Sequence, residues 1–426
     1  MSDYTKMWSE LGLDLESHDA LLSVLGGAYT DIFLSQKNRP EGMKYFDFVM
    51  SEVHGLRIQE LMDAKAQGRK VIGSYCVFVP EELILAVDSV SVGLCAGAEF
   101  NFEGAETQLP RNTCSLIKSA FGFKLGKVCP YLEASDVVVG ENTCDGKKKS
   151  YELLAPLVKD LYVMDMPQMK SAAGKALLKE EYRRFVAKLE EVSGKKITVK
   201  SLKKAVEVVN AKRKAVKRLA ELRAADPAPI SGLDALLVNQ VFFYDDPVRF
   251  TDSVHKLCDE LEERVKQGTG VFAKGTTRLI VSGCPMAVPN WKLPMLIESS
   301  DAVIVGEESC VGERGTRWLT ESQGNTVEEI IDSITERYFN IDCAIFTPNP
   351  SREEYVKEMT EKLKAQGVIH YSLQFCQPYI MESSPVEKEL EKSGMPVLRL
   401  ETDYSQEDAG QLKTRIEAFV ERLKKK

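Results

Sequence analysis

The sequence has few histidines and no recognisable nucleotide loop, and these absences exclude several common enzyme classes. Only four histidines occur in 426 residues, none of them in a nucleophile motif, so a Ser-His-Asp hydrolase is not expected. The nearest approach to a phosphate loop, residues 270–277, has Thr276 where such a loop needs a lysine, and ATP binding by this chain is rejected. No Gly-x-Gly-x-x-Gly follows the first expected strand, which argues against a standard dinucleotide site.

The chain also lacks a broad excess of positive charge and a long apolar run. The net charge is -8, which offers no attraction to nucleic acid or anionic lipid. The basic stretch between Lys195 and Arg223 is interpreted as a solvated helix face. No segment reaches the roughly 18 apolar residues of a membrane span, and the N-terminus has no apolar signal-peptide core. We therefore expect a cytoplasmic protein that binds neither nucleic acid nor membrane.

Ten cysteines are present, and their spacing is unusual. In a reducing compartment they are not expected to form a disulfide framework. Structural zinc sites usually contain Cys-x-x-Cys pairs, whereas the closest cysteines here are 15 residues apart. Thiolates gathered from distant loops suit an iron–sulfur cluster. For any one cysteine a buried packing role is the simpler interpretation, and Cys258, inside an expected helix, is interpreted as core.

Short apolar runs that lead into cysteines predict parallel strands in two separate parts of the chain. These runs cover residues 71–76, 92–95, 136–140, 278–284, 302–306 and 367–376. Apolar residues at helical spacing precede the first run and fill the middle of the chain. The expected fold class is α/β, with two doubly wound Rossmann-like domains facing a cluster cleft. The expected segments are a helical N-terminal part (1–70), a first α/β cluster-binding domain (71–170), a helical connector (171–270) and a second α/β cluster-binding domain (271–426).

The cysteines occupy corresponding places in the two halves. In order along the chain, the pairs are Cys76 with Cys284, Cys95 with Cys310, Cys114 with Cys343, and Cys144 with Cys376. Open α/β sheets bind ligands at the carboxyl ends of their strands, so two such edges would form a cleft lined with thiols. Lysines after Cys144 and an arginine after Cys310 are charges that would stabilise thiolates.

Several motifs resemble a known family. GSYCVFVPEELILA, LPRNTCSLIKS, ENTCDGKKKSYELL, EESCVGER and LQFCQPY are similar to the cluster-bearing subunits of 2-hydroxyacyl-CoA dehydratases and benzoyl-CoA reductases. The resemblance extends from about Val71 to Val420. The additional cysteines in SGCP and DCAIFTPN look like those of single-subunit double-cubane-cluster proteins.

This resemblance implies an [8Fe–9S] cluster, two [4Fe–4S] cubanes joined by a sulfide, between the two domains. Three cysteines would hold each cubane, so six ligands are needed. The correspondence of the halves favours Cys76, Cys114, Cys144, Cys284, Cys343 and Cys376. Cys310 is the main rival in the second half, and Cys95 and Cys129 are weaker candidates.

The resemblance also implies a function and partners. An ATP-hydrolysing reductase with its own [4Fe–4S] cluster would deliver low-potential electrons for the reduction of small molecules. Its docking face is expected between the lysines after Cys144 and the loop around Arg314, and the chain is expected to be a homodimer. One alternative is a 2-hydroxyacyl-CoA dehydratase subunit with a single [4Fe–4S] cluster. Another is a non-enzymatic electron-storage or cluster-delivery protein.

Overall fold

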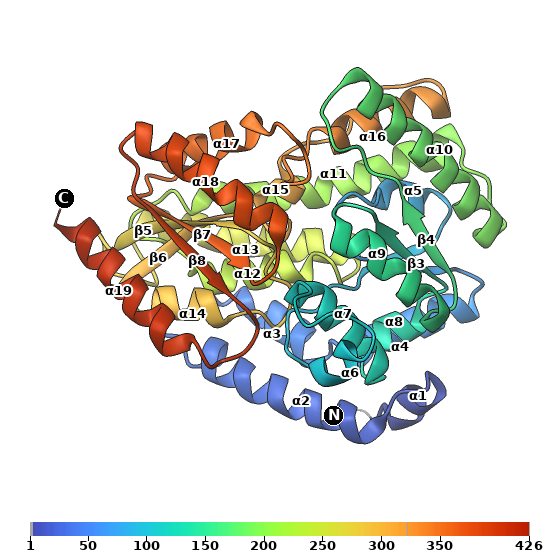
Figure 1. Cartoon of the computed structure of the whole chain (residues 1–426), viewed down its shortest axis with the longest axis horizontal. Helices are drawn as coiled ribbons and strands as arrows, with labels where there is room; N and C mark the ends of the chain where they lie inside the picture. The colour runs from blue at the N-terminus through green and yellow to red at the C-terminus, as the bar shows by residue number, and fades with distance from the viewer. Residues whose placement is uncertain (1–2, 322, 426) are drawn as a thin grey trace.

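The computed structural model describes residues 3–321 and 323–425 and contains two parallel four-stranded sheets, which lie side by side in Figure 1. The first sheet has the order β2-β1-β3-β4 and the second the order β6-β5-β7-β8, so the two halves repeat one topology. The predicted α/β fold class is confirmed. The strands are β1 (Val71–Ser74), β2 (Val90–Gly93), β3 (Val137–Glu141), β4 (Leu161–Met164), β5 (Thr277–Gly283), β6 (Ala302–Glu308), β7 (Gly367–Leu373) and β8 (Val397–Thr402).

The strands in the middle of each sheet are almost completely buried. Every residue of β3, β5 and β7 is buried, because helices cover both faces of a parallel sheet. The strands β4 and β8 lie at the sheet edges and stay partly exposed. These two edge strands were not predicted from the sequence.

Helices at the N-terminus run along one side of the molecule and contact both halves (Figure 1, blue). Met7 packs into the hydrophobic core around the first sheet. The ring of Phe33 meets that of Trp291 edge-on at 5.0 Å, in the core of the second sheet. These elements are α1 (Thr5–Glu10), α2 (Leu15–Tyr29), the π-helix η1 (Thr30–Leu34), α3 (Met43–Ser51) and α4 (Leu56–Ala66).

The middle of the chain is helical, as expected, with α10 (Ala172–Ser193), α11 (Val199–Leu222), α12 (Gly232–Val241) and α13 (Pro247–Gln267). Gly194 ends α10 in the left-handed conformation, and a Thr198–Ser201 capping box begins α11. Helix α11 joins the halves. Its Arg213 pairs with Glu82 beside the first sheet, and Arg223, which follows it, pairs with Glu307 of β6. The predicted boundaries between the segments stay predictions.

The remaining helices cover the sheet faces and lead chain segments to the carboxyl ends of the strands. They are α5 (Glu81–Ala86), α6 (Phe102–Glu106), α7 (Ser115–Leu125), α8 (Pro130–Ala134), α9 (Asp145–Leu154), the 3-10 helix η2 (Ala155–Leu157), α14 (Lys292–Glu298), α15 (Glu313–Thr316), α16 (Val327–Phe339), α17 (Pro350–Lys362), α18 (Gln377–Lys392) and α19 (Ala409–Lys424). None of the helices in the described ranges is long and apolar enough to cross a membrane. The cytoplasmic location stays a prediction.

Candidate functional site

A cavity of about 1150 Å³ lies at the carboxyl ends of the strands of both sheets. Eight cysteines line it: Cys76, Cys95, Cys114, Cys144, Cys284, Cys310, Cys343 and Cys376. This set contains all seven cysteines that sequence analysis selected or kept as the main rival, together with the weaker candidate Cys95. Cys129 is not among the lining residues, and Cys258 is fully buried in α13.

Three of these cysteines stand at the start of helices. Cys114, Cys144 and Cys376 are the N-cap residues of α7, α9 and α18. The first amides of a helix have no partner within the helix, and the helix N-terminus carries a positive partial charge. Thiolates at these positions are therefore stabilised without a side-chain cation.

Other cysteines follow the strands directly. Cys284 comes after β5 through Gly283, which has φ +136 and lies so close to β7 that an added Cβ would be 1.9 Å from the carbonyl oxygen of Tyr371. Only glycine fits this position, so the close approach of β5 to β7 fixes where Cys284 emerges. The backbone N–H of Leu373 then donates to Cys284 Sγ at 3.3 Å.

Cys76, Cys310 and Cys343 form a first group of neighbouring sulfurs, which we call the first sulfur group. Burial, opposed by Lys147 and assisted by the nearby thiols of Cys310 and Cys343, raises the pKa of the Cys76 thiol to about 12. Burial and Cys310 likewise raise the pKa of Cys343. This group draws one residue from the first half of the chain and two from the second.

Cys114, Cys284 and Cys376 form a second sulfur group, with Cys144 beside it. A hydrogen bond to Cys376, followed by burial, raises the pKa of Cys114 well above its usual range. The same bond lowers the pKa of Cys376, but Cys284 and burial outweigh it and raise that pKa well above its usual range. Burial and the neighbouring Cys114 raise the pKa of Cys144. The second group also combines both halves.

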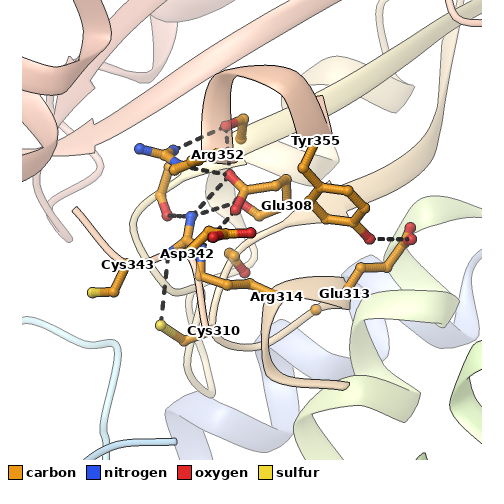
Figure 2. Close-up of polar contacts among 12 residues, drawn as sticks. Glu308, Cys310, Glu313, Arg314, Asp342, Cys343, Arg352 and Tyr355 are labelled. Carbon is orange, nitrogen blue, oxygen red and sulfur yellow. Dashed lines mark hydrogen bonds and ion pairs between the residues drawn. The ribbon is translucent and has the colours of Figure 1, made fainter. Parts of the chain in front are cut away.

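Buried charges lie next to Cys310 and Cys343 of the first sulfur group, as Figure 2 shows. Arg314 Nη1 donates to Cys310 Sγ at 3.6 Å, and Arg314 Nε donates to Glu308 at 2.6 Å. The side chain of Arg314 is 1% exposed. Arg314 itself is therefore enclosed between Glu308 and the cavity wall. The docking face expected between the lysines after Cys144 and the loop around this arginine stays a prediction.

The lysines after Cys144 divide into two kinds. Lys147 is largely buried, pairs with the buried carboxylate of Glu141, and faces Cys76 and Cys95. Lys148 and Lys149 are exposed, and each pairs with an acid on its own helix. Of these three lysines, Lys147 is the one that is largely buried and close to the thiols, while Lys148 lines the cavity with an exposed side chain.

Two residues of the site, Tyr379 and Glu308, were not predicted from the sequence. The hydroxyl of Tyr379 lies 3.8 Å from Cys343 Sγ and accepts a hydrogen bond from Arg314. Glu308 anchors Arg314. Both belong to motifs quoted above, EESCVGER and LQFCQPY, but an isolated acid or tyrosine carries no signal of burial or direction.

The donors in this cavity fit an iron–sulfur cluster. Thiolate sulfurs are the ligands that such clusters use, and here two groups of thiols from separate parts of the chain face one cavity. Within residues 3–321 and 323–425, no group of three or more His, Cys, Asp or Glu side chains is arranged to hold a single metal ion.

Comparisons with known proteins place the chain in a family. The family model described as 2-hydroxyglutaryl-CoA dehydratase, D-component, matches residues 76–423. YjiM of Escherichia coli (strain K12), named as a candidate dehydratase subunit, is 35% identical over 378 residues, which cover 88% of this chain and 96% of that protein. The (R)-phenyllactyl-CoA dehydratase beta subunit of Clostridium sporogenes is 27% identical over 387 residues, covering 89% of this chain and 99% of that protein. A benzoyl-CoA reductase subunit of Thauera aromatica is 23% identical over 348 residues, covering 81% of this chain and 87% of that protein. The chain therefore belongs to the 2-hydroxyglutaryl-CoA dehydratase D-component family, which includes subunits of dehydratases and of a reductase.

Proposed function

We propose that this chain holds a double-cubane [8Fe–9S] cluster in the cysteine-lined cavity and reduces small molecules there. The observation that carries the proposal is the presence of two separate sulfur groups at one cavity. A single cubane uses three or four thiolates, whereas seven candidate thiols face this space, with Cys95 as an eighth.

The proposed ligands follow the sulfur groups. Cys76, Cys310 and Cys343 would hold one cubane, and Cys114, Cys284 and Cys376 the other. This set contains Cys310 in place of Cys144. The set favoured by the matching order of cysteines in the two halves contains Cys144 in place of Cys310, and Cys144 remains the alternative ligand beside Cys114.

The protein's own residues prepare the site for such a cofactor. When bound, the cluster would supply low-potential electrons one at a time. The N-termini of α7, α9 and α18 stabilise thiolates without adding bulk. Lys147 and Arg314 place two cations beside the first sulfur group. Because ligand thiols must lose their protons, iron binding releases protons from this site.

An ATP-hydrolysing reductase with its own [4Fe–4S] cluster is the proposed electron donor. The absence of a phosphate loop from this sequence agrees with ATP hydrolysis by a separate protein. The relatives from C. sporogenes and T. aromatica are each named as one subunit of an enzyme, which indicates enzymes built from several chains. We propose that this chain pairs with a second copy of itself, and a monomer in light scattering at micromolar concentration would contradict that part.

A second candidate function is favoured by the names of the relatives. The C. sporogenes relative is a subunit of a dehydratase that acts on a 2-hydroxyacyl-CoA. In that alternative a single [4Fe–4S] cluster would be present, and the acyl-CoA thioester would bind in the cavity. The remaining thiols would then be packing residues.

Turnover assays separate these candidates. Protein purified without oxygen is supplied with the partner reductase and ATP, and the consumption of azide, hydrazine or acetylene is compared with the dehydration of (R)-2-hydroxyacyl-CoA thioesters. Reduction of the small molecules supports the proposal. Dehydration of the thioesters without reduction of the small molecules would contradict the proposal and support the dehydratase function. A reduced, iron-loaded protein that turns over neither class indicates electron storage.

A further inference from the structure

Two arginines share one buried carboxylate behind the first sulfur group (Figure 2). Glu308, at the end of β6, accepts from Arg314 Nε at 2.6 Å and from Arg352 Nε at 3.0 Å. All three side chains are at most 1% exposed. The trio carries one excess positive charge, which the partner carboxylate of Arg352 balances. Arg352 also pairs with Glu382, which is 11% exposed and lines the cavity.

Arg314 is held in a single orientation toward the sulfurs. Its Nη1 donates both to Cys310 Sγ and to the hydroxyl of Tyr379, which itself lies 3.8 Å from Cys343 Sγ. Its Nε and Nη2 donate to the Glu308 carboxylate, and Nη2 also reaches the carbonyl oxygen of Gly283 at 3.2 Å. Since each nitrogen has a buried acceptor, the guanidinium cannot turn away from the cavity.

The second sulfur group has a different environment. Its thiols contact each other, and Cys284 receives the backbone N–H of Leu373. Within residues 3–321 and 323–425, no lysine or arginine hydrogen-bonds to Cys114, Cys284 or Cys376. Backbone amides thus serve both groups, while the first group has in addition a directed cation and a phenol.

We propose that Arg314, a positioning residue held by Glu308, makes the two halves of the cluster unequal, so that the half at Cys76, Cys310 and Cys343 is reduced first. The inference rests on the proposed double-cubane function. Iron–sulfur potentials depend on local charge and on hydrogen bonds to the sulfurs. A buried cation stabilises the reduced form, which carries one more negative charge, and the low dielectric strengthens this effect. One electron enters from the reduced partner reductase, or from a chemical reductant in the test, and no bond is made or broken.

The test is a redox titration followed by electron paramagnetic resonance on iron-loaded full-length protein. Unaltered protein should show two one-electron steps. In Arg314→Gln the step at the higher potential should move to a more negative value while the other step stays in place. Tyr379→Phe should move the same step in the same direction by a smaller amount. Arg422→Gln, which removes an exposed arginine of α19, should move neither step.

The outcomes separate failure of the inference from failure of the proposed function. A content of four irons per unaltered chain would contradict the double cubane, and the inference that rests on it would fail as well. Eight irons with both steps unchanged in Arg314→Gln and Tyr379→Phe, or with both steps shifted equally, would overturn the inference alone. If Arg314→Gln does not retain iron, the potentials measured in Tyr379→Phe test the inference. Phenylalanine keeps the packing of the tyrosine ring and lacks only the hydroxyl.

Discussion

The thiols of Cys114 and Cys376 both line the cavity and lie close enough for each to shift the pKa of the other, although they come from opposite halves of the chain. Each caps a helix, α7 in the first half and α18 in the second. A cofactor held by both would bridge the two α/β halves. Loss of either ligand would therefore affect the metal centre and the contact between the halves together.

Serine substitutions test this arrangement. We expect Cys114→Ser and Cys376→Ser each to lower the iron content per chain or to change the electron paramagnetic resonance signal, because an alcohol is a poor ligand for iron in such clusters. Cys258→Ser, in the core of α13, is the matched control and should change neither. Unchanged iron in Cys76→Ser, Cys114→Ser and Cys376→Ser alike would refute the assigned site.

A buried ion pair fixes α5 to the central helix α11. Glu82 and Arg213 are 2.6 Å apart with side chains 0% and 3% exposed, and Tyr338 of α16 donates to the same carboxylate. Glu82→Ala leaves a buried guanidinium without its partner and should destabilise the protein by about 3–5 kcal/mol in urea unfolding. The double variant Glu82→Leu/Arg213→Met should recover much of that loss. An equal loss in the single and double variants would show that the pairing is not the cause.

The histidine pair near the N-terminus should make stability depend on pH. His18 Nε2 lies 3.0 Å from His54 Nδ1. Burial, followed by the charge of His18, lowers the pKa of His54 to about 3, and burial lowers the pKa of His18. In the unfolded chain both pKa values are about 6.5, so the unfolded state binds more protons below that pH. The stabilisation is complete above pH 6.5 or so and is lost as the pH falls toward about 3.

Urea unfolding at pH 7 and pH 4 measures this effect. A shift of one pKa unit corresponds to about 1.4 kcal/mol, and the partial exposure of His54 reduces this effect. The pair should therefore account for about 2 kcal/mol of the decrease in the free energy of unfolding between pH 7 and pH 4. His54→Gln should show a correspondingly smaller loss, and His255→Gln in α13 should match the unaltered protein. Identical pH profiles for all three proteins would show that the pair does not titrate on unfolding.

Much of the fold followed from local patterns. The strands β3, β5 and β7 were predicted because both faces are buried, which requires a continuous apolar run. The edge strands β4 and β8 were missed. In β8 the buried Leu400 and Thr402 alternate with the exposed Arg399 and Glu401, so no such run marks the strand.

The site was predictable in part for a similar reason. Parallel strands bring their carboxyl ends together, so cysteines after β1, β3, β5 and β7 had to share an edge within each sheet. How the two edges face each other is a property of tertiary packing. The grouping of Cys76 with Cys310 and Cys343 therefore could not be derived from spacing. The role of Arg314 was hidden likewise, because its burial at the start of α15 is contrary to the usual expectation that an arginine lies at the surface.

Electron delivery should require the partner and ATP. Plant-type ferredoxins lie at about −400 mV, and a buried cluster with many thiolates is expected to lie lower. Each deficit of about 59 mV lowers the equilibrium tenfold for one electron, so coupling to ATP hydrolysis is needed. We expect little substrate reduction with a reduced ferredoxin alone, and restored turnover when the reductase and ATP are added. A non-hydrolysable ATP analogue is the control. Rapid turnover with the ferredoxin alone would contradict the mechanism.

Anomalous scattering from iron in crystals grown without oxygen tests the double-cubane proposal most directly. It locates the metal without any assumption about ligands. We predict two sets of four irons in the cavity, one beside Cys76, Cys310 and Cys343 and the other beside Cys114, Cys284 and Cys376. A single set of four, with one sulfur group left free, would contradict the double cubane, and a cavity without iron would contradict the cluster altogether.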